Sequence, residues 1–380
     1  MKKSLLALAV ATGIAGAASA QTSISMYGTI DGAIRRETDN SNNATRIRMR
    51  DASNYTTNRF GFRATEELGN GANAHFVLEG GFFSGTGGQA IPGLAFDRLA
   101  FVGLTTRYGI VDLGRMFGPQ FYSAASYDPM ETRFTGITPV TRNSVSAAAN
   151  NPSNAISNSR TDNAIQYTTK FGDLVVRAMY AFGETAFGPS SGSTQAVGAV
   201  YQTPALILGA AYTKKKLIAD QMLIPGTNLS IFGNDLIPAA TASKASYQDA
   251  NYYTFGGAYT LNKFKGFLGY ASEKRDTSTV QHEERNIWTG LKYTVTPALS
   301  LTGAYFKTDL SSARGESKKD LFVISSVYAL SKRTSLFAEI DHARYDGPEV
   351  PVIAAGQFAL ASIPGAAIRK GSMVGVSHAF

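Results

Sequence analysis

The chain has 380 residues, no cysteine and a formal net charge of +8 at pH 7. The lack of cysteine excludes a disulfide scaffold, a cysteine-based zinc site and thiol catalysis. The 36 basic residues are scattered rather than run together, so composition argues against nucleic-acid binding.

The first twenty residues have the three parts of a secretory signal peptide. Lys2 and Lys3 give a cationic start, an apolar stretch follows, and the small residues Ala18, Ser19 and Ala20 form a cleavage site. The apolar stretch is too short and too rich in Gly and Ala for a membrane-spanning helix, which needs about 20 strongly apolar residues, and no later segment provides one. We expect residues 1–20 to be removed on export and residues 21–380 to form one domain. If that domain crosses a membrane, it does so as a β-barrel.

After this leader, a hairpin unit repeats along the chain, made of an alternating segment, a short turn and another alternating segment. The seven short turns are, in chain order, 68–72, 106–109, 170–173, 203–205, 262–264, 296–298 and 331–333. Seven hairpins give fourteen strands, and the alternating segments 22–37 and 368–380 add one at each end. The repeat therefore predicts an all-β fold, a transmembrane antiparallel barrel of sixteen strands with short periplasmic turns.

The connections between hairpins are longer and polar, as expected for the outer loops of such a barrel. Two of them, 117–159 and 216–249, far exceed ordinary loop length. Loops that long are usually functional or disordered.

Alternation along the segments indicates one apolar and one polar face. In 58–65, Phe60 and Phe62 fall on one face and Arg59 and Arg63 on the other. The polar faces must be solvated, so we expect the sheet to close around water with its apolar side toward lipid.

The segment 98–105 alternates in the same way, with Leu99, Phe101 and Gly103 on the apolar face and Arg98 and Ala100 on the other. One segment does not alternate cleanly. The segment 321–330 is apolar on both faces, as a strand in a large soluble sandwich would be.

Several stretches resemble the general porin family of β-proteobacteria. They are SISMYGTIDGAI, NRFGFRATEELGNGANAHFVLEGGF, DRLAFVGLTTRYGIVDLGRMFGPQF, DNAIQYTTKFGDLVVRAMYAFGE, YALSKRTSLFAEID and the terminal GVSHAF. The resemblance spans the chain after the leader and is weakest in the long loops. It implies a homotrimer in the bacterial outer membrane, in contact with lipid and lipopolysaccharide. Each barrel would be a water-filled channel for passive diffusion of small hydrophilic solutes and ions, with no cofactor.

The resemblance also implies that the third outer loop, 117–159, folds inward and narrows the pore. Acidic residues on that loop would face a ladder of wall arginines, which by motif are Arg59, Arg98 and Arg160. The loop acids that match are Asp128 and Glu131. Because wall arginines exceed loop acids, we predict anion preference.

Further charged residues form a secondary group of lumen candidates, for which an ordinary solvated or hydrogen-bonding role is favoured. They are Arg35, Arg63, Arg115, Arg177, Asp31 and Glu79. At the other end of the chain, Phe380 resembles the C-terminal phenylalanine by which the barrel-assembly machinery recognises outer-membrane barrels.

Other motifs do not support catalysis or metal binding. The Gly188–Gly192 segment GPSSG lacks the strand–turn–helix context of a serine nucleophile, and the four histidines have no metal-ligand spacing. Asp341 and His342 adjoin, but adjacent strand residues point to opposite faces, so they cannot share one lumen site. Two alternatives remain open: a solute-specific channel with a saturable site at 117–159, and a non-channel surface barrel acting as an adhesin or enzyme.

Overall fold

The structure, a computed structural model, describes residues 22–40, 44–49, 56–91, 93–132, 160–183, 192–217, 248–276, 281–312, 315–348, 351–354, 357–360 and 367–380. The predicted leader, 1–20, and most of both long loops lie outside these ranges. Within the described ranges, no helix is long and apolar enough to cross a membrane.

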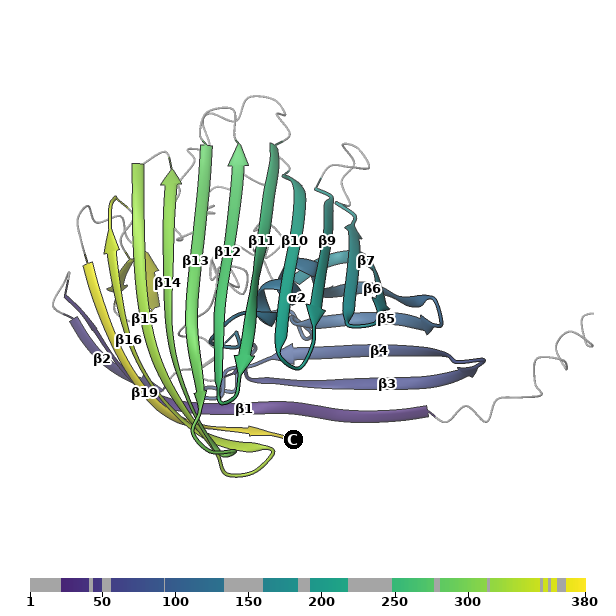
Figure 1. Cartoon of the computed structure of the whole chain (residues 1–380), viewed down its shortest axis with the longest axis horizontal. Coiled ribbons are helices and arrows are strands. Elements are labelled where there is room, and N and C mark those ends of the chain that lie inside the picture. The colour runs from purple at the N-terminus through teal and green to yellow at the C-terminus, as the bar shows by residue number, and fades with distance from the viewer. Residues whose placement is uncertain are drawn as a thin grey trace, which may run out of the picture.

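Antiparallel strands make up nearly all of the described chain (Figure 1). The first half contains β1 (Thr22–Asp39), β2 (Ala44–Met49), β3 (Arg59–Gly69), β4 (Ala72–Gly81), β5 (Leu99–Thr106), β6 (Gly109–Phe117), the helix α2 (Pro119–Ser126), β7 (Arg160–Phe171), β8 (Leu174–Ala181) and β9 (Thr194–Gln202). The second half contains β10 (Leu206–Leu217), β11 (Gln248–Leu261), β12 (Phe264–Asp276), β13 (Gln281–Thr294), β14 (Leu299–Ser312), β15 (Gly315–Ala329), β16 (Thr334–Asp346) and β19 (Ala367–Ala379). A separate small hairpin, β17 (Pro351–Ala354) and β18 (Gln357–Leu360), lies between β16 and β19.

The strands close into a barrel of sixteen, as predicted. One edge of β1 pairs with β19, from Thr29 opposite Ala379 to Asp39 opposite Arg369. The other edge of β1 pairs first with β3 and then with β2. Because β2 and β3 follow each other along the same edge, they act as one interrupted barrel strand, and the sheet has no free edge.

All seven predicted short turns join hairpins, and they gather at one end of the barrel. The turn between β3 and β4 has Asn70 at φ 53° and Gly71 at φ 73°, the left-handed pair that matches the twist of a tight hairpin. The strand ends that lead into the longer connections lie at the opposite end of the barrel. Both long loops are slightly shorter than predicted. Phe117 belongs to β6, β10 runs to Leu217 and β11 begins at Gln248.

The outer surface of the barrel is apolar and the inner surface carries charge. On β1, Ile30 and Ile34 are exposed on the outside, whereas Asp31, Arg35 and Glu37 are buried on the inside. This is the alternation that a barrel in lipid with a polar lumen requires.

The predicted facing of β5 is wrong. Leu99, Phe101 and Gly103 point inward, while Val102 and Leu104 are exposed on the outside. The inner face of β5 tolerates apolar side chains because Phe101 packs on a buried cluster inside the barrel, formed by Met116, Ala164, Met179, Ala181 and Ala196. Arg98 still reaches the lumen, but from the position just before β5, where strand alternation does not apply.

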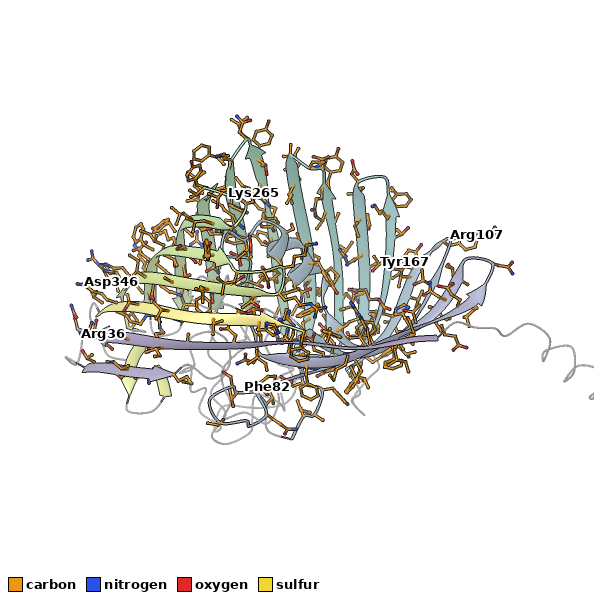
Figure 2. All side chains as sticks on the ribbon, turned by 90° about the horizontal axis from the view of Figure 1, so that it is seen from below. Arg36, Phe82, Arg107, Tyr167, Lys265 and Asp346 are labelled. Carbon is orange, nitrogen blue, oxygen red and sulfur yellow. The ribbon has the colours of Figure 1, made fainter. Side chains whose placement is uncertain are left out.

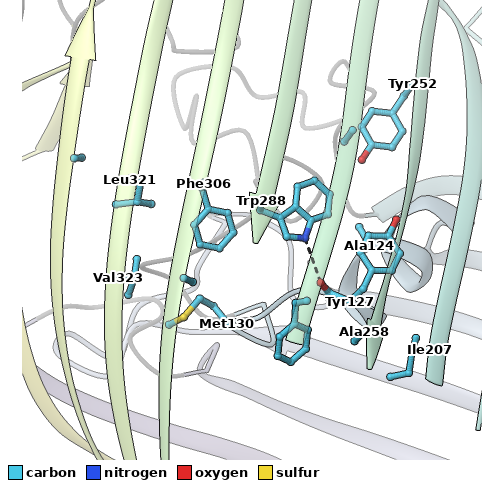
Figure 3. Close-up of a cluster of buried hydrophobic side chains, with 14 of the residues drawn as sticks. Ala124, Tyr127, Met130, Ile207, Tyr252, Ala258, Trp288, Phe306, Leu321 and Val323 are labelled. Atoms are coloured by element: carbon cyan, nitrogen blue, oxygen red, sulfur yellow. Dashed lines mark hydrogen bonds between the residues drawn. The ribbon is translucent and has the colours of Figure 1, made fainter. Parts of the chain in front are cut away.

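The segment 321–330 is apolar on both faces for a related reason. Its inward residues Leu321 and Val323 belong to a buried cluster that also holds Trp288, Phe306 and Met130 of the third loop (Figure 3). The apolar inner face therefore marks where the loop rests on the wall, and not a dry barrel core.

The C-terminal residue, Phe380, contacts β1 where the first and last barrel strands meet. Gly28 and Phe380 exchange backbone hydrogen bonds, 3.1 and 3.2 Å long, and the Phe380 ring lies over Gly28. A Cβ atom at position 28 would collide with that ring.

Candidate pore constriction

The third loop turns into the barrel directly after β6. Its first segment, α2, begins at Pro119, a favoured residue for the first helical turn, and packs against the inner faces of β9, β10 and β11. Gln120, Ser123 and Ala124 are buried there, and Thr213 of β10 donates a hydrogen bond to Gln120. The described part of the loop, 118–132, thus occupies the lumen; 133–159 lies outside the described residues.

Inward glycines of four strands create the space for this segment. We call Gly198, Gly209, Gly256 and Gly290 the glycine seat. A Cβ at Gly198 would come within 3.0 Å of Pro119, one at Gly209 within 2.8 Å of Tyr127, and one at Gly256 within 2.6 Å of the same ring. At Gly290 it would collide with Pro129. Larger residues on these strands would therefore push the loop off the wall.

Trp288 fixes the loop on this seat (Figure 3). Its ring stacks on Tyr127 with centroids 5.7 Å apart, and its Nε1 donates to the Tyr127 carbonyl oxygen at 3.2 Å. Thr254 donates to the Tyr270 carbonyl oxygen, so it accepts the 2.7 Å hydrogen bond from the Tyr127 hydroxyl. Burial raises the pKa of Tyr127 to about 12, so this phenol stays a neutral donor at any physiological pH.

Trp288 is the only tryptophan of the chain, so its fluorescence reports on this contact directly. We expect blue-shifted emission and little quenching by acrylamide in the native protein, because the side chain is fully buried. Replacing Tyr127 with Ala should uncover the indole, with red-shifted emission and quenching several times stronger. Strong quenching in the unsubstituted protein would contradict the seated loop.

Four arginines gather on the wall formed by β3 to β7, and we call Arg59, Arg98, Arg115 and Arg160 the arginine cluster. Glu79 links two of them: its carboxylate lies 2.5 Å from Arg98 Nε and 3.7 Å from Arg59 Nε. Arg98 is close enough to repel both Arg59 and Arg160. The three arginines predicted from motifs are therefore neighbours in space.

Asp97 and Asp162 complete the acidic side of the cluster. Arg115 forms an ion pair with Asp162 and donates to the Asp97 carbonyl oxygen at 2.7 Å. Asp97 accepts from the Gly81 amide, and its charge attracts Arg160. With Glu79, three carboxylates face four guanidinium groups, so the cluster keeps one excess positive charge.

The end of β6 and the inward loop supply aromatic partners to the wall arginines. The Arg160 guanidinium carbon lies 4.8 Å from the ring centroid of Phe117, and that of Arg177 lies 4.0 Å from the ring centroid of Tyr122. Phe121 stacks on Phe117 with centroids 4.0 Å apart. Such cation–π contacts hold the arginine side chains in place without neutralising their charge.

The two predicted loop acids lie at the far end of the described loop, against β13, which is half-way round the barrel from β5 in the strand order. Asp128 is buried, and its carboxylate accepts hydrogen bonds from the Met130 and Thr132 amides at 3.0 and 2.9 Å. Glu131 is exposed and pairs with Lys292 of β13 at 2.5 Å. Both carboxylates thus interact with their own turn or with the nearby wall.

The secondary candidates differ from one another. Arg35 is fully buried and pairs with Glu37 and Asp341 at 2.5 and 2.6 Å, so it joins strands at the barrel seam. The Asp31 carboxylate accepts from the Thr56 amide. Arg63 is exposed in the lumen, and its Nε donates to Ser25.

The sequence interpretation missed Asp97, Asp162, Lys292 and Trp288. The sequence argued against a shared site for Asp341 and His342, and the two side chains do face opposite sides of β16, one buried and one exposed.

Among the described residues, no group of three or more His, Asp or Glu side chains is arranged to hold a metal ion.

A closed barrel with an apolar outside, a charged lumen and an inward loop defines a membrane channel of the outer-membrane β-barrel class. The family model for Gram-negative porins matches residues 6–348. The chain therefore belongs to the Gram-negative porin family, and it is an outer-membrane channel.

Similar proteins agree with this assignment. An outer membrane porin of Bordetella pertussis is 27% identical, covering 90% of this chain and 94% of that protein. Outer membrane porin protein 32 of Delftia acidovorans is 29% identical over 100% of both chains. Among solved structures, an anion-selective porin from Comamonas acidovorans has a TM-score of 0.74 at 24% identity, covering 95% of this chain and 100% of that one. The trimer form of OmpT from Vibrio cholerae has a TM-score of 0.63 at 14% identity, covering 94% and 99%.

Proposed function

We propose that this porin prefers anions and that the arginine cluster sets the preference. The observation that carries the proposal is the excess of guanidinium groups: Arg59, Arg98, Arg115 and Arg160 against Glu79, Asp97 and Asp162. In the narrow part of a water-filled pore, the excess sign selects the permeant ion. Glu131 does not offset it, because Lys292 already pairs with that carboxylate.

The buried Asp128 carboxylate and the arginine cluster would together set a transverse field across the lumen. Asp128 and Glu131 lie against one side of the barrel and the arginine cluster on the other. Such a field orients dipolar solutes as they pass. Replacing Glu131 with Gln tests whether its pair with Lys292 is neutral in the pore: the anion preference should become slightly stronger, because Lys292 then has no carboxylate partner.

Solute flux tests the passive character of the channel. In liposomes containing the purified protein, swelling rates should rise linearly with solute concentration and fall steeply with solute size. Saturation for one class of solute would instead favour a specific binding site at the constriction.

We further propose that the protein is a homotrimer, as the trimer form of OmpT is. The broad apolar outer surface suits contacts with both lipid and sister subunits. Cross-linking in detergent solution should give a trimer as the largest product.

Phe380 is proposed to serve assembly as well as to close the seam. Deleting Phe380 should lower the yield of folded protein in the outer membrane severalfold, because the last strand loses both its terminal backbone bonds and the ring over Gly28. Phe380→Tyr keeps the ring and should assemble normally, whereas Gly28→Val should fail like the deletion. The measurement is the amount of heat-modifiable protein in outer-membrane fractions; an unchanged yield for the deletion would refute the role.

A further inference from the structure

A histidine and an aspartate meet on the inner wall of the barrel, although their strands are not neighbours. His75 lies on β4 and Asp112 on β6, and both are opposite Gly103 of β5 in the register. The His75 Nε2 atom lies 2.8 Å from Asp112 Oδ1. A Cβ atom at Gly103 would collide with both the imidazole and the carboxylate, so the contact depends on a glycine at this position. We call His75 and Asp112 the histidine–aspartate pair.

The pair lies between the short-turn end of the barrel and the arginine cluster. Figure 2 shows Arg107, in the turn between β5 and β6, at the end of the barrel opposite Arg36 and Asp346. Asp112 lies on β6 between Arg107 and Arg115, three residues, or about 10 Å, from the latter. An ion that passes the arginine cluster therefore also passes the histidine–aspartate pair.

The wall holds the imidazole in place and leaves it in contact with the lumen. Phe101 packs edge-on against the His75 ring, with centroids 6.3 Å apart and an interplanar angle of 81°, and it rests on the buried cluster around Met116. The side chains of His75 and Asp112 are 17% and 13% exposed. Protons from the pore water therefore reach a fixed imidazole.

The other titratable and charged groups around the pair keep their charge over the range in which imidazole titrates. They face it from three other elements and from β4 itself: Arg63 and Glu67 of β3, Tyr122 of α2, Arg177 of β8 and Glu79 of β4. Guanidinium and carboxylate groups ordinarily stay ionised between about pH 5.5 and 8. Burial raises the pKa of the Tyr122 hydroxyl, which therefore stays neutral. On β7, the residue opposite Asp112 is the uncharged Gln166.

The remaining histidines do not share this position. Of the histidines whose side chains the structure describes, His342 and His378 are exposed on the outward face of the barrel, and only His75 faces the lumen. Imidazole is the side chain whose charge ordinarily changes between pH 5 and 8. A change of lumen charge in that range therefore falls on the histidine–aspartate pair.

We propose that the histidine–aspartate pair makes the ion preference of the pore depend on pH. With a neutral imidazole, the Asp112 carboxylate offsets part of the positive excess of the arginine cluster. Once His75 is protonated, the imidazolium neutralises that carboxylate, and the preference for anions becomes stronger. The inference deepens the anion preference proposed above and rests on it for the baseline, but the direction of the change with pH follows from the pair alone.

The test measures the zero-current potential of the full-length protein in a planar bilayer at about pH 8 and about pH 5.5. The salt is kept low, because the Debye length is about 30 Å at 0.01 M and the charge is then felt across the lumen. One unit of charge about 10 Å from the path of the ions should raise the anion-to-cation permeability ratio about twofold at the lower pH.

Three single variants assign the change to the pair. His75→Gln keeps a polar side chain that does not titrate, so its ratio should stay at both pH values where the unsubstituted protein has it at pH 8. Asp112→Asn removes one negative charge, so at pH 8 it should already show the ratio that the unsubstituted protein reaches at pH 5.5. His342→Gln, on the outward face, is the matched control and should keep the full pH dependence. Heat-modifiable mobility checks that each variant forms a barrel.

The proposal would be overturned if the pH dependence persisted in His75→Gln, vanished in His342→Gln, or if Asp112→Asn left the ratio at pH 8 unchanged. A stronger preference for cations on acidification would also contradict it. The sign of the potential at pH 8 tests the proposed anion preference separately, because protonation of His75 shifts the ratio toward anions from either baseline.

Discussion

Replacing both Arg59 and Arg160 with Gln is expected to convert the channel from anion preference to cation preference. The two substitutions leave Arg98 and Arg115 facing Glu79, Asp97 and Asp162, so the excess charge of the cluster changes sign. The strong Arg98–Glu79 ion pair at 2.5 Å stays intact, which protects the wall from an unpaired buried carboxylate. The preference should weaken at high salt, where the charges are screened.

The measurement is the zero-current potential across a planar bilayer with a tenfold gradient of potassium chloride. A perfectly selective pore would give about 59 mV, and we expect a shift of on the order of 20 mV that crosses zero. Arg63→Gln is the matched control, because Arg63 also faces the lumen but lies four residues, or about 13 Å, from Arg59 along β3. A reversal as large for Arg63→Gln would show that total lumen charge, and not the cluster, sets the preference.

Replacing Trp288 with Ala is expected to release the third loop from the wall. The variant loses the stacking on Tyr127 and the hydrogen bond to the Tyr127 carbonyl oxygen, and it leaves a cavity where the indole fills the space over Gly269. Truncation of a buried Trp to Ala typically costs about 3–5 kcal/mol, most of which would fall here on the docking of the loop. The loop then samples several positions in the lumen, because the barrel itself is held by its strand ladders.

Single-channel recording should show this release as strong open-channel noise and a larger, more variable conductance. Trp288→Phe keeps an aromatic ring against Tyr127 and loses only the N–H donor, so its conductance should stay close to the original. Far-UV circular dichroism and heat-modifiable mobility check that both variants form barrels. A quiet conductance of the original size in Trp288→Ala would show that the indole does not hold the constriction.

The sequence was most informative where local chemistry determines the structure. Short turns such as Asn70-Gly71 adopt the backbone conformation that a tight hairpin needs, so the strand count followed from the turns and the two end segments. The motifs named three arginines that the structure brings together on the lumen wall. Arg59 begins β3, where inward and outward residues alternate, whereas Arg160 begins β7 just before a register shift against β6. Arg98 was placed correctly in the lumen but for the wrong reason, because it precedes β5 and its own position is set by its backbone bond to Glu79.

The remaining site residues depend on contacts between distant parts of the chain. Asp97 lies before a strand, where alternation gives no facing, and Asp162 matters only because β6 and β7 bring it to Arg115. The glycine seat and Trp288 come from four strands, β9, β10, β11 and β13, and the inward loop brings them into one contact surface. One local signal did exist: the apolar inner face around Leu321 and Val323 is unusual for a polar lumen, and it marks the wall that the loop covers.

The central claim is that the chain is an open channel whose narrowest part is basic. Single-channel recording of the purified protein in a planar bilayer, made across a salt gradient, tests it most directly. We predict stepwise increases in conductance and a zero-current potential whose sign shows that anions permeate more readily than cations. Absence of steps, or a potential of the opposite sign, would contradict it.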